Sequence, residues 1–238
     1  MRLNGQSAAE IGTAGRCVLN REKSVSSVVV SSHPLVHHHI ATLRDSRTSP
    51  VEFRRVVRML AVLLAQEATA DLPTCAGEVT TPLGRAEARI LKDVVGIVPI
   101  LRAGLGMADG VIELLPDAEV WHIGLYRDET TLRPREYYNK FPVRTRVTLA
   151  LLVDPMLATG GSAVRACEII KSAGVTRLKL LTLIAAPEGI ELLSRLMPDV
   201  EIHIGAIDSG LNEVGFIYPG LGDAGDRQFG TGVEPAEE

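Results

Sequence analysis

Cysteines, aromatic residues and long apolar runs are all scarce in this 238-residue chain. The three cysteines, Cys17, Cys75 and Cys167, are too few and too scattered for a disulfide framework or a zinc site. Aromatic residues make up 4% of the chain, so its core must consist mainly of aliphatic side chains. No apolar run approaches the ~20 residues of a membrane-spanning helix, and the first 25 residues lack the apolar segment of a signal peptide. We therefore expect a soluble protein of a reducing, cytoplasmic compartment.

A surplus of basic residues is also missing. The chain has 25 Lys and Arg against 29 Asp and Glu, and its formal net charge is −4. Proteins that bind nucleic acid through its phosphates normally carry a basic surplus or a basic stripe. The charge balance therefore disfavours a nucleic-acid partner, and we expect none.

The beginning of the chain differs from the rest. Residues 1–27 are small, polar and aperiodic, which predicts a loose N-terminal extension. Residues 28–238 have a suitable length for a single α/β domain. Within it, residues 71–91 contain two prolines and two glycines, and they predict a hairpin or an irregular excursion. A helix is predicted to begin at Pro50, with an apolar face formed by Val56, Met59, Leu60, Leu63 and Leu64.

Aliphatic strands alternate with helices from residue 93 onwards. The predicted strands span residues 93–101, 118–126, 147–154, 177–186 and 200–208. The predicted helices between them span residues 104–115, 161–174 and 187–197. Continuous aliphatic strands that alternate with helices are typical of an α/β fold, a twisted parallel sheet with helices on both faces. Ligands of such sheets bind beyond the carboxyl ends of the strands, so the residues just after each strand are the candidates for a site.

The segment "LLVDPMLATGGS", residues 151–162, ends a strand at an acid. An unpaired Asp154 would be costly inside a sealed core. The small residues after it let backbone N–H groups converge, and a helix that starts near Gly161 adds its positive end. An acid that can accept two vicinal hydroxyls beside a phosphate cradle suits a ribose 5-phosphate. The alternative is a tight strand-to-helix turn with an N-cap, but the acid and the length of the loop favour the phosphate.

Two further strand ends carry residues that packing does not explain. In "VPILRAGLGM", Arg102 follows a strand and precedes small residues, which suits a multiply charged group such as pyrophosphate. A surface arginine at a turn is the alternative there. Near the end of the chain, "GFIYPGLGDAGDRQFGT" places five glycines among 17 residues. Such a loop is entropically costly to order, and lining a ligand pocket is a common reason for it.

Taken together, these segments closely resemble the uracil phosphoribosyltransferase family. The resemblance rests on "PILRAGLGM", "DPMLATGGS", "AAPEGI" and "YPGLGDAGDRQFGT". Phosphoribosyltransferases in general carry two adjacent acids in the ribose loop, whereas the uracil enzymes have Asp-Pro. Asp154-Pro155 therefore makes the resemblance specific to that subgroup.

The resemblance implies a type I phosphoribosyltransferase fold with a flexible hood, here the insert at about 127–146. The implied reaction transfers ribose 5-phosphate from phosphoribosyl pyrophosphate (PRPP) to uracil, giving UMP and pyrophosphate. Mg²⁺ is the implied cofactor, bound through PRPP, with no certain direct protein ligand. The implied partners are uracil and PRPP, a second copy of the chain in a homodimer or higher homo-oligomer, and GTP as an effector that some relatives use.

The resemblance also assigns the binding residues. Those implied for PRPP are Arg102, Arg127, Asp154, Pro155, Met156, Leu157, Ala158, Thr159, Gly160, Gly161, Ser162 and Asp223. Those implied for uracil are Ile217, Gly222, Asp223 and Ala224.

Two rival functions stay open at the level of sequence. A pyrimidine-responsive RNA-binding regulator with a related fold would need a basic face, against which the net charge of −4 weighs. A phosphoribosyltransferase for another base would differ in the C-terminal loop, which here is similar to the uracil type.

Overall fold

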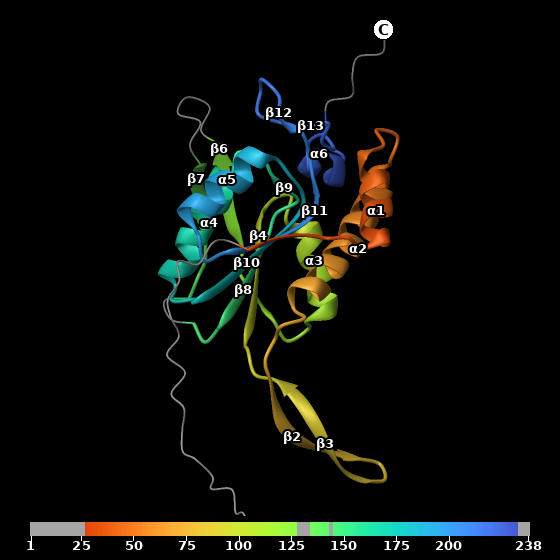
Figure 1. Ribbon diagram of the computed structural model, residues 1–238, viewed down its shortest axis with the longest axis vertical. Coiled ribbons are helices and arrows are strands. Elements are labelled where there is room, and N and C mark those ends of the chain that lie inside the picture. Colours follow the sequence, from red (N-terminus) through yellow and green to blue (C-terminus); the bar gives the residue numbers. More distant parts are fainter. Residues whose placement is uncertain (1–26, 128–133, 143–144, 233–238) are drawn as a thin grey trace, which may run out of the picture.

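The structure, a computed structural model, describes residues 27–127, 134–142 and 145–232. A twisted, mostly parallel sheet runs through the middle of these residues (Figure 1). Its strands follow the order β1-β11-β10-β8-β4-β6-β7, with β5 beside β4 and β9 beside β10. The strand bounds are β1 (Val28–Val30), β4 (Val95–Leu101), β5 (Glu119–Val120), β6 (Ile123–Arg127), β7 (Pro134–Asn139), β8 (Leu149–Val153), β9 (Met156–Leu157), β10 (Arg177–Ala185) and β11 (Glu201–Ile207). The α/β prediction is confirmed.

Helices cover both faces of the sheet, as Figure 1 shows. The helices α1 (Pro34–Arg44), α2 (Pro50–Ala68) and α3 (Leu105–Leu114) share one aliphatic core with the sheet. The helices α4 (Gly161–Ser172) and α5 (Pro187–Leu196) share a second core on the opposite face. Residues that alternate along β8 belong to different cores, since Leu151 lies in the first and Leu152 in the second. This alternation is why the strand is aliphatic at every position.

Some details of the predicted elements were wrong. The predicted strand 118–126 is divided into β5 and β6. β7, inside the predicted hood insert, pairs antiparallel with β6, so the sheet is mixed at this edge. In α2, Ser49 caps the helix as its sequence suggests, but Met59 is 36% exposed and Leu63 is only partly buried. The buried face of α2 is centred on Val56, Leu60 and Leu64 instead.

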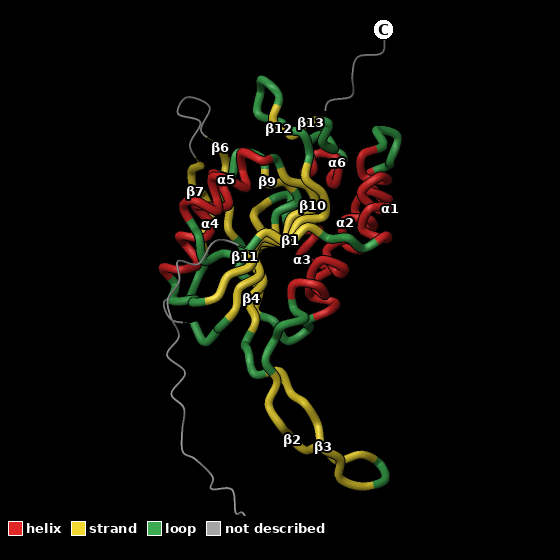
Figure 2. The backbone as a smooth tube through the Cα atoms, viewed as in Figure 1, coloured by secondary structure: helices red, strands yellow, loops and turns green. Residues whose placement is uncertain are grey.

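The predicted hairpin is confirmed as β2 (Thr74–Thr81) and β3 (Gly84–Leu91), which pair antiparallel. It projects away from the rest of the structure at the end opposite β12 and β13 (Figure 2). Its apolar residues Val79, Leu83, Ile90 and Leu91 are exposed. A two-stranded hairpin is at best marginally stable alone.

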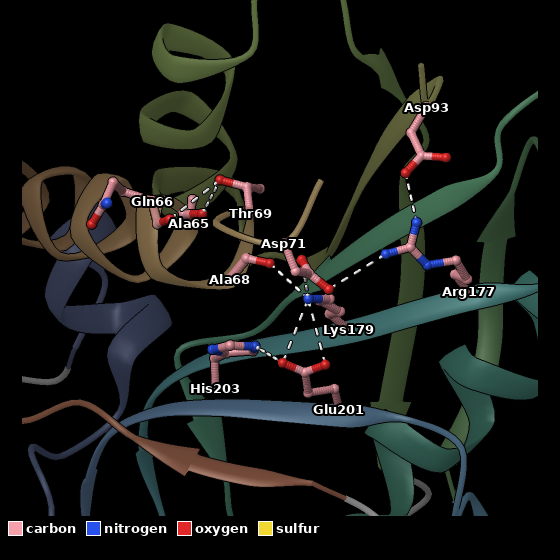
Figure 3. Close-up of polar contacts among 10 residues, drawn as sticks. All are labelled: Ala65, Gln66, Ala68, Thr69, Asp71, Asp93, Arg177, Lys179, Glu201 and His203. Atoms are coloured by element: carbon pink, nitrogen blue, oxygen red, sulfur yellow. Dashed lines mark hydrogen bonds and ion pairs between the residues drawn. The ribbon is translucent and has the colours of Figure 1, made fainter. Parts of the chain in front are cut away.

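An ionic network centred on the buried side chain of Lys179 crosses the amino ends of β10 and β11 (Figure 3). The Lys179 ammonium donates to Asp71 and to the Ala68 carbonyl, each over 2.8 Å, and lies 3.4 Å from a Glu201 oxygen. Glu201 also lies 2.6 Å from Nε2 of His203. Burial lowers the pKa of His203, and the adjacent Glu201 opposes this shift. The network ties the end of α2 to the sheet, at the edge opposite the carboxyl ends of the strands.

No helix in the described part of the chain is long and apolar enough to cross a membrane.

Candidate functional site

The first two strand ends lie side by side at the carboxyl edge of the sheet. β4 and β8 are adjacent parallel strands, in which Pro99 aligns with Val153. The turn after β4 packs tightly on β8, because a Cβ atom added to Gly104 would lie 2.6 Å from the Val153 carbonyl oxygen. Arg102 and Asp154, which come directly after these two strands, are therefore brought together, as their positions in the sequence predict.

Asp154 opens the loop between β8 and α4. Its Oδ1 accepts a long hydrogen bond, 3.5 Å, from the backbone N–H of Met156. The loop ends at Gly160, whose φ of +81° is a left-handed conformation that glycine adopts without strain. Gly161 then starts α4, whose first N–H groups have no partners within the helix. An acid and a helix amino end thus adjoin the same loop, and a helix amino end is suited to binding a phosphate.

The Asp154 carboxyl is electrostatically destabilised when charged. Desolvation raises its pKa to about 7, and the hydrogen bond from Met156 opposes the shift only in part. Among the ion pairs of the described residues, none involves Asp154. Perturbed carboxyls are frequent at functional sites, and within the described part of the chain no ion pair accounts for this one.

The segment "AAPEGI" supports the same loop from α5. A Cβ atom on Gly189 would lie 2.4 Å from the Ala158 carbonyl oxygen, and one on Gly160 would lie 2.8 Å from the Gly189 carbonyl. Only glycine permits this approach at both positions. The contact explains why this segment accompanies the loop in the sequence pattern.

The third segment, near the end of the chain, meets Arg102 of the second segment through α6 (Ala224–Phe229). Asp223 caps this helix, because its carboxylate accepts from the Asp226 N–H over 2.9 Å. The Asp226 carboxylate in turn accepts from Arg102 Nη2 over 3.0 Å. Arg102, Asp154 and Asp223, which come from three distant parts of the sequence, therefore belong to one edge of the fold.

The residues predicted to bind uracil form a glycine-rich loop after β13 (Ile217–Tyr218), which pairs antiparallel with β12 (Gly210–Leu211). The side chains of Ile217 and Ala224 are buried in the first core. Gly222 has a φ of +74°. At these positions the loop can offer a ligand mainly its backbone N–H and carbonyl groups.

The hood part of the predicted site lies partly outside the described residues. Arg127 is the last residue of β6, and β6 is separated from β8, the strand before Asp154, by β4 alone. The predicted hood insert, 127–146, includes β7, but its residues 128–133 and 143–144 lie outside the described residues. The predicted extension, 1–27, also lies outside them apart from its last residue.

Several residues at this edge were not predicted. Asp208 comes directly after β11, so the rule that found Asp154 could have found it. Arg44 and Arg227 contact the C-terminal loop from positions that carry no such signal.

The acids at this edge do not form a metal site by themselves. Among the described residues, no group of three or more His, Cys, Asp or Glu side chains is placed to hold a metal ion. Mg²⁺ commonly binds through one or two carboxylates together with substrate phosphates. The residues present fit a cation that arrives with a polyphosphate, and they do not fit a cage made of protein ligands.

A groove lies among the helices. It has a volume of about 900 Å³ and is lined by residues of α1, α2, α3 and α6, among them Leu35, Met59, Leu63, Leu105 and Phe229. Asp154 is not among the residues that line this groove.

Known proteins resemble this chain over nearly all of the described residues. The family "Uracil phosphoribosyltransferase" matches residues 30–231. A protein of that name from Roseiflexus sp. (strain RS-1) is 54% identical over 208 residues, which are 87% of this chain and 100% of the relative. Another, from Symbiobacterium thermophilum, is 53% identical over the same shares. Among solved structures, the AQ2163 protein from Aquifex aeolicus superposes with a TM-score of 0.81 at 37% identity, covering 87% of this chain and 100% of that one.

Proposed function

The chain belongs to the uracil phosphoribosyltransferase family, and we propose that its strand-end site transfers ribose 5-phosphate from PRPP to uracil, with release of pyrophosphate and formation of UMP. The observation that supports this site most strongly is the meeting of three segments at one edge of the sheet. Arg102 donates to Asp226, and its turn packs on Val153, the residue before Asp154. The reaction places the chain in pyrimidine salvage.

The ribose 5-phosphate of PRPP is assigned to the loop of residues 154–162. The Asp154 carboxylate accepts hydrogen bonds from the two vicinal ribose hydroxyls. These bonds replace the water contacts that the carboxylate loses on burial. The phosphate binds to the N–H groups of the loop and to the amino end of α4. The large share of small residues in this loop lets the backbone approach the phosphate.

The pyrophosphate is assigned to Arg102 and Arg127, with Asp223 reaching towards PRPP. Bond breaking at the anomeric carbon leaves positive charge on the ribose ring and negative charge on the pyrophosphate. The arginines stabilise the leaving group, and Asp154 keeps the ring in place, so no covalent nucleophile is needed. Mg²⁺, bound through PRPP, would add positive charge beside the leaving group.

Uracil is assigned to Ile217, Gly222, Asp223 and Ala224. Because the side chains of Ile217 and Ala224 are buried, backbone N–H and carbonyl groups of the loop form the hydrogen bonds to O2, N3–H and O4 of the base. A backbone group held in place for O4 opposes the amino group of cytosine.

The experiment that tests the site is calorimetric titration of the purified protein with PRPP and Mg²⁺, alongside an assay of UMP formation. The unmodified chain should bind PRPP and produce UMP and pyrophosphate in equal amounts. Asp154→Asn should weaken PRPP binding and UMP formation together. UMP formation with undiminished PRPP binding by Asp154→Asn would remove the loop from the PRPP site while leaving the family's reaction intact.

We further propose that the chain forms a homodimer or higher homo-oligomer. The hairpin of β2 and β3 exposes Val79, Leu83, Ile90 and Leu91 far from its own core, and contact with a second copy would cover them. Light scattering of the purified chain tests this proposal, and a monomer at micromolar concentration would contradict it. GTP as an effector rests on the family resemblance alone, and titration of activity with GTP would test it.

The remaining proposals concern organisation. We propose that residues 28–238 form one phosphoribosyltransferase domain, that residues 1–27 are an appendage to it, and that the insert at about 127–146 covers the site during the reaction. The family match begins at residue 30, which supports the first boundary. A cytoplasmic location is proposed because PRPP is multiply charged and does not cross a membrane unaided.

A further inference from the structure

Gly220, in the glycine-rich loop after β13, is held in place through both its backbone N–H and its backbone carbonyl. The N–H of Gly220 donates to Oδ2 of Asp208 over 3.0 Å. The carbonyl of Gly220 accepts from Nη1 of Arg44 over 2.8 Å. The φ of Gly220 is +64°, and a Cβ atom there would lie 2.1 Å from the Ile217 carbonyl oxygen. Gly220 is therefore fixed in a conformation that a larger residue could not adopt.

Arg44 and Asp208 also hold each other. Arg44 Nη1 donates to Oδ2 of Asp208 over 2.9 Å, and Nη2 donates to Oδ1. This is a bidentate pair, which restricts orientation as well as distance. The Asp208 side chain is only 4% exposed and that of Arg44 27% exposed, so solvent screens the pair weakly.

The pair is built on two rigid elements. Arg44 is the last residue of α1, where a cation is favourable near the carbonyl end of the helix. Asp208 comes directly after β11, and its N–H donates to the Ala185 carbonyl at the end of β10 over 2.9 Å. The glycine-rich loop is thereby attached to a helix and to the central sheet at a single residue.

A second arginine, Arg227 of α6, links the neighbouring residue of the loop to the carboxyl end of α1. Arg227 Nη1 donates to the Leu221 carbonyl over 2.8 Å, and its Nη2 donates to the Asp45 carbonyl over 2.6 Å. Its guanidinium also stacks on Phe53, 4.5 Å from the ring centre. The carboxyl end of α1 thus holds two consecutive residues, Gly220 and Leu221, between the two parts of the loop assigned to uracil.

We propose that Arg44 and Asp208 are positioning residues for base selection. The inference rests on the proposed assignment of uracil to Ile217, Gly222, Asp223 and Ala224. Backbone groups discriminate between uracil and cytosine only if they cannot move to suit the wrong base. The pair at Gly220 sets the spacing between Ile217 and Gly222, so it determines how firmly the two ends of the recognition edge are held.

Steady-state kinetics of four variants tests the proposal. Arg44→Gln and Asp208→Asn break the bidentate pair, while Arg44→Lys retains a cation that can still reach one partner. Arg47→Gln is the matched control, because Arg47 lies near the same end of α1, pairs with Asp45 alone among the described residues, and has a side chain that is 88% exposed. KM for uracil, KM for PRPP, kcat, the ratio of kcat/KM for uracil to that for cytosine, and Tm are measured for each variant.

The expected result separates positioning from general stability. Arg44→Gln and Asp208→Asn raise KM for uracil roughly tenfold or more, in line with the loss of hydrogen bonds to charged groups. KM for PRPP stays within about twofold, because the loop of Asp154 is held by other elements. The preference for uracil over cytosine falls by a similar factor, and Arg44→Lys restores part of both losses. Arg47→Gln behaves as the unmodified chain. A fall in Tm with unchanged KM for uracil and unchanged base preference would overturn the proposal.

A loop variant distinguishes failure of this inference from failure of the assignment beneath it. Gly222→Ala strains a residue with φ of +74° inside the loop itself. If Gly222→Ala raises KM for uracil while the Arg44 and Asp208 variants do not, the loop binds uracil and the positioning role is refuted. If Gly222→Ala leaves KM for uracil unchanged, uracil does not bind at this loop, and both the assignment and the inference built on it are refuted.

Discussion

Arg102, at the end of β4, donates a hydrogen bond to Asp226 of α6 over 3.0 Å. The two side chains are 56% and 36% exposed, so this ion pair adds little to the stability of the fold. The ion pair instead positions the Arg102 guanidinium near Asp223, at the edge of the sheet where Asp154 also lies. A cation held in this way is prepared for a polyphosphate.

Replacing Arg102 should therefore impair catalysis and spare folding. Arg102→Ala is expected to lower kcat/KM for PRPP by roughly 10²-fold or more, as is typical when a group that stabilises developing charge is removed. Its Tm should remain within about 2 °C of the unmodified chain, since exposed pairs contribute little. Arg55→Ala, which removes an exposed arginine paired with Glu52, serves as the control for charge. Equal kcat/KM values for the two variants would show that Arg102 does not meet the substrate.

Asp154→Asn should fold and lose most of its activity. The amide can still accept a hydrogen bond, but it lacks the charge that makes the contacts with the ribose hydroxyls strong. We expect kcat to fall on the order of 10²-fold or more. Initial rates of UMP formation at saturating PRPP and uracil provide the measurement. Near-normal turnover by the folded variant would place Asp154 outside the site.

The same substitution should stabilise the free protein, increasingly so at higher pH. Desolvation raises the pKa of Asp154 to about 7, above its ordinary value of 3.8. Between these two values the folded chain binds a proton that the unfolded chain has released, so this residue's contribution to stability falls as the pH rises to about 7. Asparagine does not ionise, and it avoids this loss.

Melting curves at pH 5 and pH 8 test this prediction. The Tm of Asp154→Asn should exceed that of the unmodified chain by a smaller margin at pH 5 than at pH 8, because the loss begins at pH 3.8 and is complete only near pH 7; each kcal/mol corresponds to roughly 2–4 °C. Asp109→Asn, which removes an exposed carboxyl of α3, serves as the control for loss of a negative charge at both pH values. A Tm difference that is the same at both pH values would contradict the desolvation of Asp154.

The ionic network around Lys179, at the amino ends of the strands, should affect the stability of the fold and leave catalysis unchanged. In Figure 3, Lys179 lies between Asp71 and Glu201, and its side chain is 6% exposed. Lys179→Met removes the hydrogen bonds from the buried ammonium to Asp71 and to the Ala68 carbonyl, which is expected to cost about 1.5–3 kcal/mol. The values of kcat and KM at 25 °C should stay unchanged, because the network lies at the amino ends of the strands.

Lys171 offers a matched control for this prediction. It pairs with Asp199 at 2.5 Å, but its side chain is 30% exposed and that of Asp199 53% exposed. Lys171→Met should cost about 1 kcal/mol or less. Urea denaturation compares the two variants, and similar losses would show that burial does not strengthen the Lys179 network.

The sequence predicts the central strands and the helices between them because both faces of those strands are buried. Edge strands lack that signal. β1 is a run of three exposed valines that is recognisable only from its pairing with β11. β7, "PREYYN", is polar, and its backbone pairing with β6 is what makes it a strand.

The residues of the candidate site likewise fall into those that the sequence predicts and those that only the structure reveals. Asp154 and Arg102 were predictable because each comes directly after a buried strand. Arg44 was not, because its contacts with Asp208 and Gly220 span 164 and 176 residues of sequence. Its helical position resembles that of any surface arginine, and only the folded chain shows what it holds.

The choice of base tests the central claim most directly. The purified chain, with PRPP and Mg²⁺, is given uracil, cytosine, hypoxanthine or adenine, and kcat/KM is measured for each. A backbone edge that opposes the cytosine amino group leaves buried polar groups unpaired, at about 1–3 kcal/mol for each group. The account predicts UMP formation from uracil, with the other three bases at least ~10³-fold poorer. Comparable kcat/KM values for uracil and cytosine would contradict recognition by the backbone of residues 217–224, and a preference for a purine would contradict the proposed reaction itself.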